Sequence, residues 1–208
     1  MTSPGRFRID GRVADRAEQA VVAVLWVWLV YRAWPPAFTA EYTASVVLLI
    51  SEGVVLLFLL LRRQTACISL RPWDWLIAAA GSFVPLLVTT NAPTFAPAVG
   101  TPLMLAGLIM HVGAKLSLNV SFGLVAANRG VKRRGFYRLV RHPMYAGYIL
   151  SHIGFLLVRP TWWNAGLYSL QAALLLLRIA AEERVLLTDP SYQRFAEQVR
   201  YRLLPGVY

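Results

Sequence analysis

The sequence predicts an all-α membrane protein, a polytopic bundle of about five to six transmembrane helices with a C-terminal helical hairpin and a polar cytoplasmic loop and tail. Hydrophobic residues make up 57% of the 208 residues and charged residues only 15%, a balance that a soluble core of this size cannot bury. The apolar residues form long runs, and no segment alternates as a barrel strand would. Because unpaired backbone groups are costly in lipid, these runs are expected to be helices.

Four runs have the roughly 17 to 25 apolar residues that a helix needs to cross the hydrocarbon core. They cover residues 20–38, 43–61, 74–92 and 101–118. The stretch before them, residues 1–18, carries four arginines and three acidic residues. It is unlike a cleavable signal sequence, so we expect it to remain on the protein as an interfacial helix.

Two further apolar segments follow a polar loop. Residues 145–158 are short for a full crossing, and Arg159-Pro160 turns the chain into a longer run, residues 162–180. We expect these segments to form a helical hairpin that dips into the bilayer or just crosses it.

No long Ser-, Gly- or Pro-rich linker divides the chain, so it is expected to be one membrane domain over residues 1–208. Within it, residues 1–118 supply the N-terminal helices and residues 119–208 form a distinct C-terminal region.

The net charge of +11 is concentrated in loops and at helix ends. All but two of the 21 lysines and arginines lie before the first run, between the second and third, from Lys115 to Arg141, or from Arg178 onward. By the positive-inside rule, we expect these segments and both termini to lie on the cytoplasmic side of an inner (plasma) membrane. Basic loops that face an anionic lipid bilayer account for the charge, so we expect no nucleic acid partner.

The residues that commonly bind metals are few. The single cysteine, Cys67, excludes an internal disulfide and a Cys-rich metal site, and the three histidines are not spaced as a ligand set. We therefore expect no metal. The absence of a Gly-x-Gly-x-x-Gly loop also excludes a cofactor domain of the soluble dinucleotide-binding type.

Two polar residues lie deep in apolar runs, Glu52 in the second and His111 in the fourth. Such groups are costly in lipid and are usually turned inward and paired. Either the two residues contact each other and join two helices, or they line a substrate pocket. Nearby Gly107 is expected to let helices approach closely.

The polar loop before the hairpin ends in Arg141-His142-Pro143. Proline suits the first position of a helix because its missing N–H would be unpaired there anyway. Arg141 and His142 then stand at a helix N-terminus, which favours an anion such as a carboxylate or phosphate. A basic cluster for lipid headgroups would explain residues 132–134, but it does not explain why Arg-His-Pro is followed by Tyr145, Gly147 and Tyr148.

Glu182 and Glu183 lie at the cytoplasmic end of the last apolar run, where they oppose the helix dipole and need a partner. If the hairpin closes, its two cytoplasmic ends meet, and Arg141 and His142 come close to these glutamates. The group then either binds a ligand that bears a carboxylate, an amine and hydroxyls, or forms a self-contained salt bridge.

Three motifs occur in order in the C-terminal region. They are Tyr137-Arg-Leu-Val-Arg-His-Pro-Met-Tyr-Ala-Gly-Tyr148, then Glu182-Glu183, then Tyr201-Arg-Leu-Leu-Pro205. From about Ser121 to the C-terminus, the chain resembles the isoprenylcysteine carboxyl methyltransferase family and its bacterial relatives, in which such motifs enclose S-adenosylmethionine. The first four helices are similar only in kind.

The resemblance implies a methyltransferase that uses S-adenosylmethionine, releases S-adenosylhomocysteine and acts on a hydrophobic small-molecule or lipid-like acceptor, with a carboxyl oxygen as one candidate acceptor atom. It implies that Arg141 helps to hold the carboxylate of the cofactor. The cofactor-binding residues that it implies are Tyr137, Arg141, His142, Pro143, Tyr145, Gly147, Tyr148, Glu182 and Glu183.

One departure from the family pattern concerns the substrate. Bacterial relatives often have Gly-Arg before the Ser-Phe that matches Ser121-Phe122, whereas this chain has Asn119 and Val120. The substrate contact of that arginine is therefore not carried over. The prenylated C-terminal cysteine on which eukaryotic members act is not carried over either.

Methyl transfer from a sulfonium is an in-line displacement, so the protein has mainly to align donor and acceptor in a site with little water. An anionic acceptor would need a positive neighbour such as Arg200 or Arg202, and an amine acceptor would need a base. Arg202 and Glu183 are the candidate catalytic residues. The candidates for the substrate pocket are Glu52, His111 and Arg200.

Two other classes of membrane protein share some of these features. Membrane sterol reductases share an Arg-His-Pro-x-Tyr-x-Gly element and use NADPH, but they usually have Asn after the proline and Glu after the glycine, where this chain has Met144 and Tyr148. A small transporter or lipid-binding scaffold would explain six helices and Glu52 with His111, but not the two cytoplasmic clusters. The motifs therefore favour the methyltransferase and leave open whether O, N or S is methylated.

Overall fold

A computed structural model describes residues 11–34, 57, 60, 61, 68–89, 93–118, 125–128 and 130–208. In this part of the chain there are six α-helices, two short 3-10 helices and no strand beyond one isolated bridge between Ile68 and Ala127. The predicted all-α class is confirmed. Glu52 and Cys67 lie outside the described residues, as does most of the second predicted run.

The first helix, α1 (Gly11–Ala33), begins well before the predicted start at residue 20. Residues 11–18 are its first turns, so they do not form a separate interfacial helix. Glu18 explains the difference, because its side chain is buried and accepts a hydrogen bond from the backbone N of Val125 at 2.9 Å. A charged residue that is paired inside the protein need not end the helix.

The third predicted run is shorter than expected. It forms α3 (Pro72–Phe83), followed by the 3-10 helix η2 (Val84–Leu87). Pro85 accounts for the early end, since proline lacks a backbone N–H and its ring clashes with the carbonyl four residues earlier.

The next two helices, α4 (Pro97–Leu118) and α5 (Pro143–Val158), pack closely through glycines. A Cβ added to Gly107 would lie 2.6 Å from the carbonyl oxygen of Gly147. Gly100 and Gly154 meet in the same way nearer the other end of the two helices, with a Cβ on Gly100 only 2.5 Å from the Gly154 oxygen. The close approach predicted at Gly107 is confirmed.

The hairpin is completed by α6 (Trp162–Leu186), which extends two turns beyond the predicted end at residue 180. Thr161 caps its start by accepting a hydrogen bond from the Asn164 backbone N at 3.0 Å. The next helix is α7 (Pro190–Gln198), which lies outside the predicted runs. Asp189 caps its start by accepting a hydrogen bond from the Ser191 backbone N at 2.7 Å.

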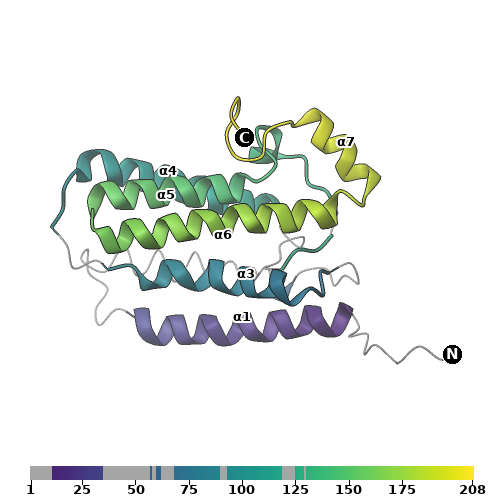
Figure 1. Cartoon of the computed structure of the whole chain (residues 1–208), viewed down its shortest axis with the longest axis horizontal. Helices are drawn as coiled ribbons and strands as arrows, with labels where there is room; N and C mark the ends of the chain where they lie inside the picture. Colours follow the sequence, from purple (N-terminus) through teal and green to yellow (C-terminus); the bar gives the residue numbers. More distant parts are fainter. Residues whose placement is uncertain are drawn as a thin grey trace.

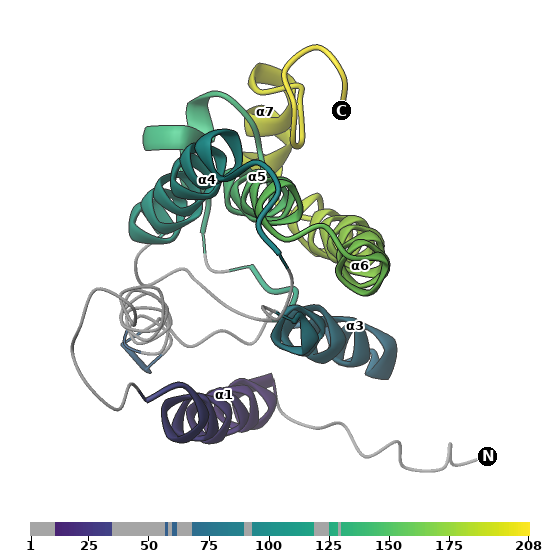
Figure 2. The same cartoon turned by 90° about the vertical axis from the view of Figure 1, so that its left-hand side faces the viewer.

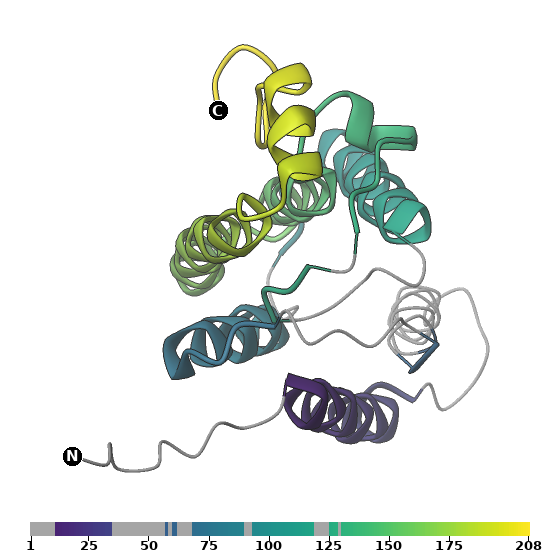
Figure 3. The ribbon, with the colours of Figure 1, turned by 90° about the vertical axis from the view of Figure 1, so that its right-hand side faces the viewer.

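One common direction is shared by α1, α3, α4, α5 and α6, with α5 between α4 and α6, and with α3 and α1 below them (Figures 1 and 2). At one end of the bundle, α4 and α6 finish, α5 starts, and α7 and the C-terminal tail gather (Figures 1 and 3). We call this the polar end. Segments far apart in the sequence meet there.

Two of the described helices, α4 and α6, are long and apolar enough to cross a bilayer, and α5 is a shorter apolar helix. Large apolar side chains on the helices face outward, including Val24 of α1 and Ile109 of α4, which are 67% and 65% exposed. Extensive exposed apolar surface of this kind indicates contact with lipid. The number of crossings, five to six, stays a prediction.

Candidate active site

At the polar end, the start of α5 meets the end of α6. The Nε of Arg141 donates a hydrogen bond to Oε1 of Glu183 at 2.7 Å. His142 lies between both glutamates, with its Nε2 3.3 Å from Oε1 of Glu183 and its Nδ1 3.6 Å from Oε2 of Glu182. The predicted meeting of these four residues is confirmed, and it explains why two carboxylates are stable at a helix C-terminus.

Arg141 also fastens the C-terminal tail. Its Nη1 donates to the carbonyl oxygens of Val199 at 3.0 Å and Arg200 at 2.8 Å, and its backbone N donates to the Tyr201 oxygen at 2.9 Å. The next backbone N, that of His142, donates to the Arg202 oxygen at 2.8 Å. The Arg-His pair therefore binds the tail against the first turn of α5.

Glu183 is the centre of a charged cluster that we define as Arg141, His142, Glu182, Glu183 and Arg202. In addition to Arg141 and His142, it accepts a hydrogen bond from Nε of Arg202 at 2.7 Å. The Glu183 side chain is 5% exposed, whereas that of Arg202 is 38% exposed and lies over the Tyr208 ring. The two candidate catalytic residues thus bind each other, while the Arg200 side chain is exposed.

Glu182 is held by a second set of contacts. The hydroxyl of Tyr145 donates to Oε1 of Glu182, and the Tyr145 ring lies 5.3 Å from the guanidinium carbon of Arg178. Arg178 was not among the predicted site residues. The signal was present, because a buried cation inside an apolar helix is costly and usually serves a site.

The pKa of His142 reflects this setting. Burial by itself lowers the pKa, but hydrogen bonds and charge interactions with Glu182 and Glu183 outweigh it and raise the pKa above its ordinary value. The protonated imidazolium is thereby favoured, and it joins the two carboxylates.

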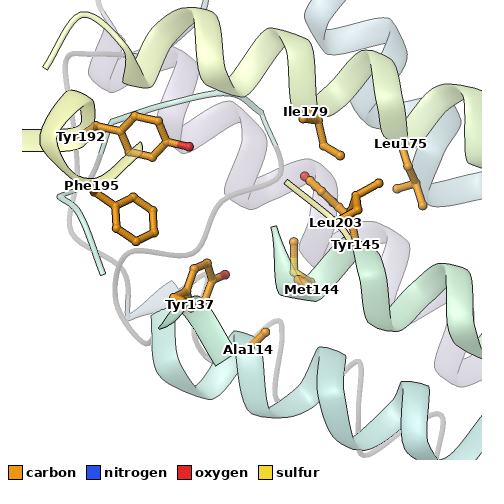
Figure 4. Close-up of a cluster of buried hydrophobic side chains, with 9 residues drawn as sticks. All are labelled: Ala114, Tyr137, Met144, Tyr145, Leu175, Ile179, Tyr192, Phe195 and Leu203. Atoms are coloured by element: carbon orange, nitrogen blue, oxygen red, sulfur yellow. The ribbon is translucent and has the colours of Figure 1, made fainter. Parts of the chain in front are cut away.

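A pocket with an empty volume of about 740 Å³, partly open to solvent, lies beside this cluster. Figure 4 shows five of the lining side chains within a buried cluster: Tyr137, Met144, Tyr145, Tyr192 and Phe195. Its main polar lining comes from Lys132, Tyr137, Arg141, His142, Glu182 and Tyr192. Its apolar lining comes from Leu118, Val125, Ala127, Val131, Leu186 and Phe195, with Met144 and Tyr145 at the start of α5.

The predicted cofactor-binding residues divide into two groups. Five of them line the pocket: Tyr137, Arg141, His142, Tyr145 and Glu182. Pro143 is buried at the first position of α5, and Glu183 binds its three cations from outside the lining.

Gly147 and Tyr148 face α4 instead of the pocket. A Cβ on Gly147 would lie 2.6 Å from the backbone N of His111, and the Tyr148 ring stacks on the His111 ring with centroids 4.8 Å apart. His111, a candidate for the substrate pocket, therefore packs in the α4–α5 interface. The predicted partner of His111, Glu52, lies outside the described residues.

Several lining residues were not predicted as part of the site. Tyr192 and Phe195 come from α7, where they lie three residues apart on one face with ring centroids 5.6 Å apart. Lys132 appeared only in the alternative of a basic cluster for lipid headgroups. The Tyr-x-x-Phe spacing was the signal for a buried helix face, but the sequence alone does not say which surface that face covers.

The segment 125–128 forms one wall of the pocket, and residues distant in sequence hold it in place. Ser69 N donates to the Ala126 oxygen at 2.8 Å, and Nδ2 of Asn128 donates to Asp189 at 2.9 Å. Ser69 and Arg184 in turn both donate to the buried Asp74 at the start of α3. The wall is thus tied to α1, α3, α6 and α7.

Residues 96–188 of the chain match the isoprenylcysteine carboxyl methyltransferase (ICMT) family, and a search of curated proteins found no match. The matched region contains α4, the polar loop, α5 and α6, and therefore Arg141, His142, Glu182 and Glu183. The family is one of methyltransferases, which favours this activity over a reductase, a transporter or a scaffold. Together with the apolar helices, the match supports the predicted family: residues 96–188, which supply most of the pocket lining, are similar to the isoprenylcysteine carboxyl methyltransferase family.

Proposed function

We propose that the protein transfers a methyl group from S-adenosylmethionine to a hydrophobic or lipid-like acceptor at the polar end of the bundle, on the cytoplasmic side. The observation that carries the proposal is the pocket where α5 meets α6. It is charged on one side and apolar and aromatic on the other, and most of it is built by the region that matches a methyltransferase family.

The chemistry of the pocket fits S-adenosylmethionine. Glu182 and Lys132 line it and would bind the amino and carboxylate groups of the ligand. Arg141 is already bound to Glu183 and to the tail, so it would act by holding the pocket in shape.

Bound S-adenosylmethionine would supply a methyl group activated by its attachment to a sulfonium, a reaction that depends mainly on alignment and on exclusion of water. The tail that Arg141 and His142 fasten would cover the site from the solvent side. Arg202, held by Glu183 but partly exposed, would offer positive charge to an anionic acceptor.

A hydrophobic acceptor also suits the outer surface of the hairpin. A second pocket, with an empty volume of about 540 Å³, lies between α5 and α6. It is lined mainly by apolar side chains, among them Ile149, Ile153, Leu156 and Ala172. Because these helix faces would be surrounded by lipid, an acceptor dissolved in the bilayer could approach the hairpin here.

Thermal unfolding of the detergent-purified protein tests the cofactor. A ligand that binds only the folded state raises the midpoint, so S-adenosylmethionine and S-adenosylhomocysteine should raise it and NADPH should not. Glu182→Gln should weaken the effect of both adenosyl compounds, whereas Glu197→Gln, which changes an exposed residue of α7, should not. A shift with NADPH alone would overturn the proposal.

Transfer itself can be followed with S-adenosylmethionine labelled in the methyl group. Membranes that contain the protein should incorporate label into material extracted by organic solvent, and membranes with the Glu182→Gln protein should incorporate much less. If the label stays in the aqueous phase with both proteins, a hydrophobic acceptor is wrong.

A further inference from the structure

Tyr192 is a buried polar residue whose side chain makes no hydrogen bond to the charged residues of the site. Its side chain extends from α7 into the pocket lining and is 4% exposed. Among the pocket-lining residues that the structure describes, it is the one with a buried side-chain oxygen that has no hydrogen-bond partner. Figure 4 shows its hydroxyl pointing away from α7 toward the interior of the cluster.

An unpaired buried hydroxyl needs a reason, because most buried polar groups in folded proteins have a partner. The hydroxyl can donate a hydrogen bond at neutral pH, since burial and the nearby Glu183 raise the pKa of Tyr192 above its ordinary value. Two polar neighbours are already occupied, Arg141 by Glu183 and by the tail, and Tyr145 by Glu182.

Tyr192 belongs to an aromatic wall that we define as Tyr137, Tyr192 and Phe195. Tyr192 and Phe195 meet edge to face at an interplanar angle of 61°, and all three residues lie in one buried cluster. A flat, largely apolar group with a few polar atoms is the kind of ligand that such a wall binds, with a single hydroxyl to fix its orientation.

We propose that the aromatic wall is the subsite for the nucleoside half of the methyl donor, and that the Tyr192 hydroxyl is its hydrogen-bonding group. This proposal rests on the proposed function and adds to it an orientation. The nucleoside half lies toward α7, and the amino-acid half lies toward Glu182 and Lys132, on the charged side of the pocket.

The test compares two probes, S-adenosylhomocysteine and 5′-methylthioadenosine, which has the nucleoside but no amino-acid group. Tyr192→Phe removes one hydrogen bond to the ligand, so it should lower the affinity for both probes by the same factor, about three- to tenfold. Glu182→Gln should lower the affinity for S-adenosylhomocysteine and leave the affinity for 5′-methylthioadenosine unchanged. Tyr31→Phe removes a hydroxyl that is 87% exposed and should change neither affinity.

The ligand-free protein supplies a second readout. Because the Tyr192 hydroxyl is buried without a partner, Tyr192→Phe should leave the unfolding midpoint unchanged or raise it. A lower midpoint would show that the hydroxyl serves the fold. Unchanged affinity for both probes, or a loss confined to S-adenosylhomocysteine, would also overturn the subsite while leaving the proposed function in place. A wild-type protein that binds neither probe nor S-adenosylmethionine would overturn both.

Discussion

Glu183 shows how much one side chain can organise. Its buried carboxylate binds Arg141, His142 and Arg202, which come from the start of α5 and from the tail. Ionised groups are expensive to bury, and they are retained only when partners compensate the lost hydration. The salt bridge therefore lies beside the pocket: Glu183 binds Arg141, His142 and Arg202, and Glu182 lines the pocket.

Replacing Glu183 tests this organising role. Glu183→Gln leaves Arg141, whose side chain is only 9% exposed, without its carboxylate. Removing one partner of a buried ion pair typically costs about 3 to 5 kcal/mol. We expect a loss of stability of this order in chemical unfolding of the purified protein. Glu197→Gln is the matched control on an exposed glutamate, and an equal effect of the two changes would contradict the prediction.

The raised pKa of His142 predicts a pH dependence of stability. The imidazolium is favoured in the folded state by Glu182 and Glu183, so its contribution is fully present below the unfolded pKa of about 6.5. That contribution is lost as the pH rises through the higher folded pKa. The difference in unfolding midpoint between wild type and His142→Gln should therefore be largest at acidic pH and shrink with rising pH. A difference that grows with pH would show that the sign is wrong.

Among the elements, α4 and α5 have the tightest interface. Backbone atoms of one helix lie where a Cβ of the other would be, at Gly100, Gly107, Gly147 and Gly154. Close backbone approach of this kind is a common way for helices to associate where the surroundings are as apolar as the side chains. It also sets the start of α5, and therefore Arg141 and His142, relative to the end of α4.

The glycine interface predicts a contrast between two alanine substitutions. Gly147→Ala places a Cβ 2.6 Å from the His111 backbone N, so the helices must separate, at a cost of about 1 to 3 kcal/mol. Gly166→Ala in α6 meets nothing within 4 Å and should be neutral or stabilise by up to about 1 kcal/mol. Thermal unfolding measures both, and a stable Gly147→Ala protein that binds the cofactor poorly would instead indicate a direct contact with the ligand.

At the scale of the whole molecule, the polar end gathers the charged cluster, the pocket, α7 and the tail (Figure 1). The opposite end carries the short link before α4, where Phe95 is 76% exposed and its backbone N donates to the Val158 oxygen at 3.1 Å. Arginines concentrate at the polar end, which is the distribution expected for a cytoplasmic face.

This orientation can be tested by cysteine labelling in a protein whose native Cys67 is replaced by serine. In spheroplasts, a membrane-impermeant maleimide should label Phe95→Cys, and it should label Arg194→Cys, an exposed position of α7, only after the membrane is opened. Equal labelling of both in sealed spheroplasts would contradict a cytoplasmic site, and the reverse pattern would invert the topology.

The local sequence was enough to predict features that depend on residues near one another in the chain. Long apolar runs predict the helices, Pro143 and the helix dipole predict an anion-binding start to α5, and the uncompensated carboxylates of Glu182 and Glu183 predict that Arg141 and His142 approach them. The early end of α3 could also have been expected from Pro85, and the aromatic pair of α7 from its spacing.

Only the tertiary structure decided which surfaces those elements cover. It assigned Gly147 to the α4–α5 interface, Arg141 to the tail, and the Tyr192 side chain to the lining of the pocket. Sequence periodicity tells which face of a helix is buried but carries no information about its partner, because that choice depends on contacts between residues far apart in the chain. The motif could therefore be located in the sequence. Which of its residues hold the fold and which line the pocket could not be predicted from the sequence.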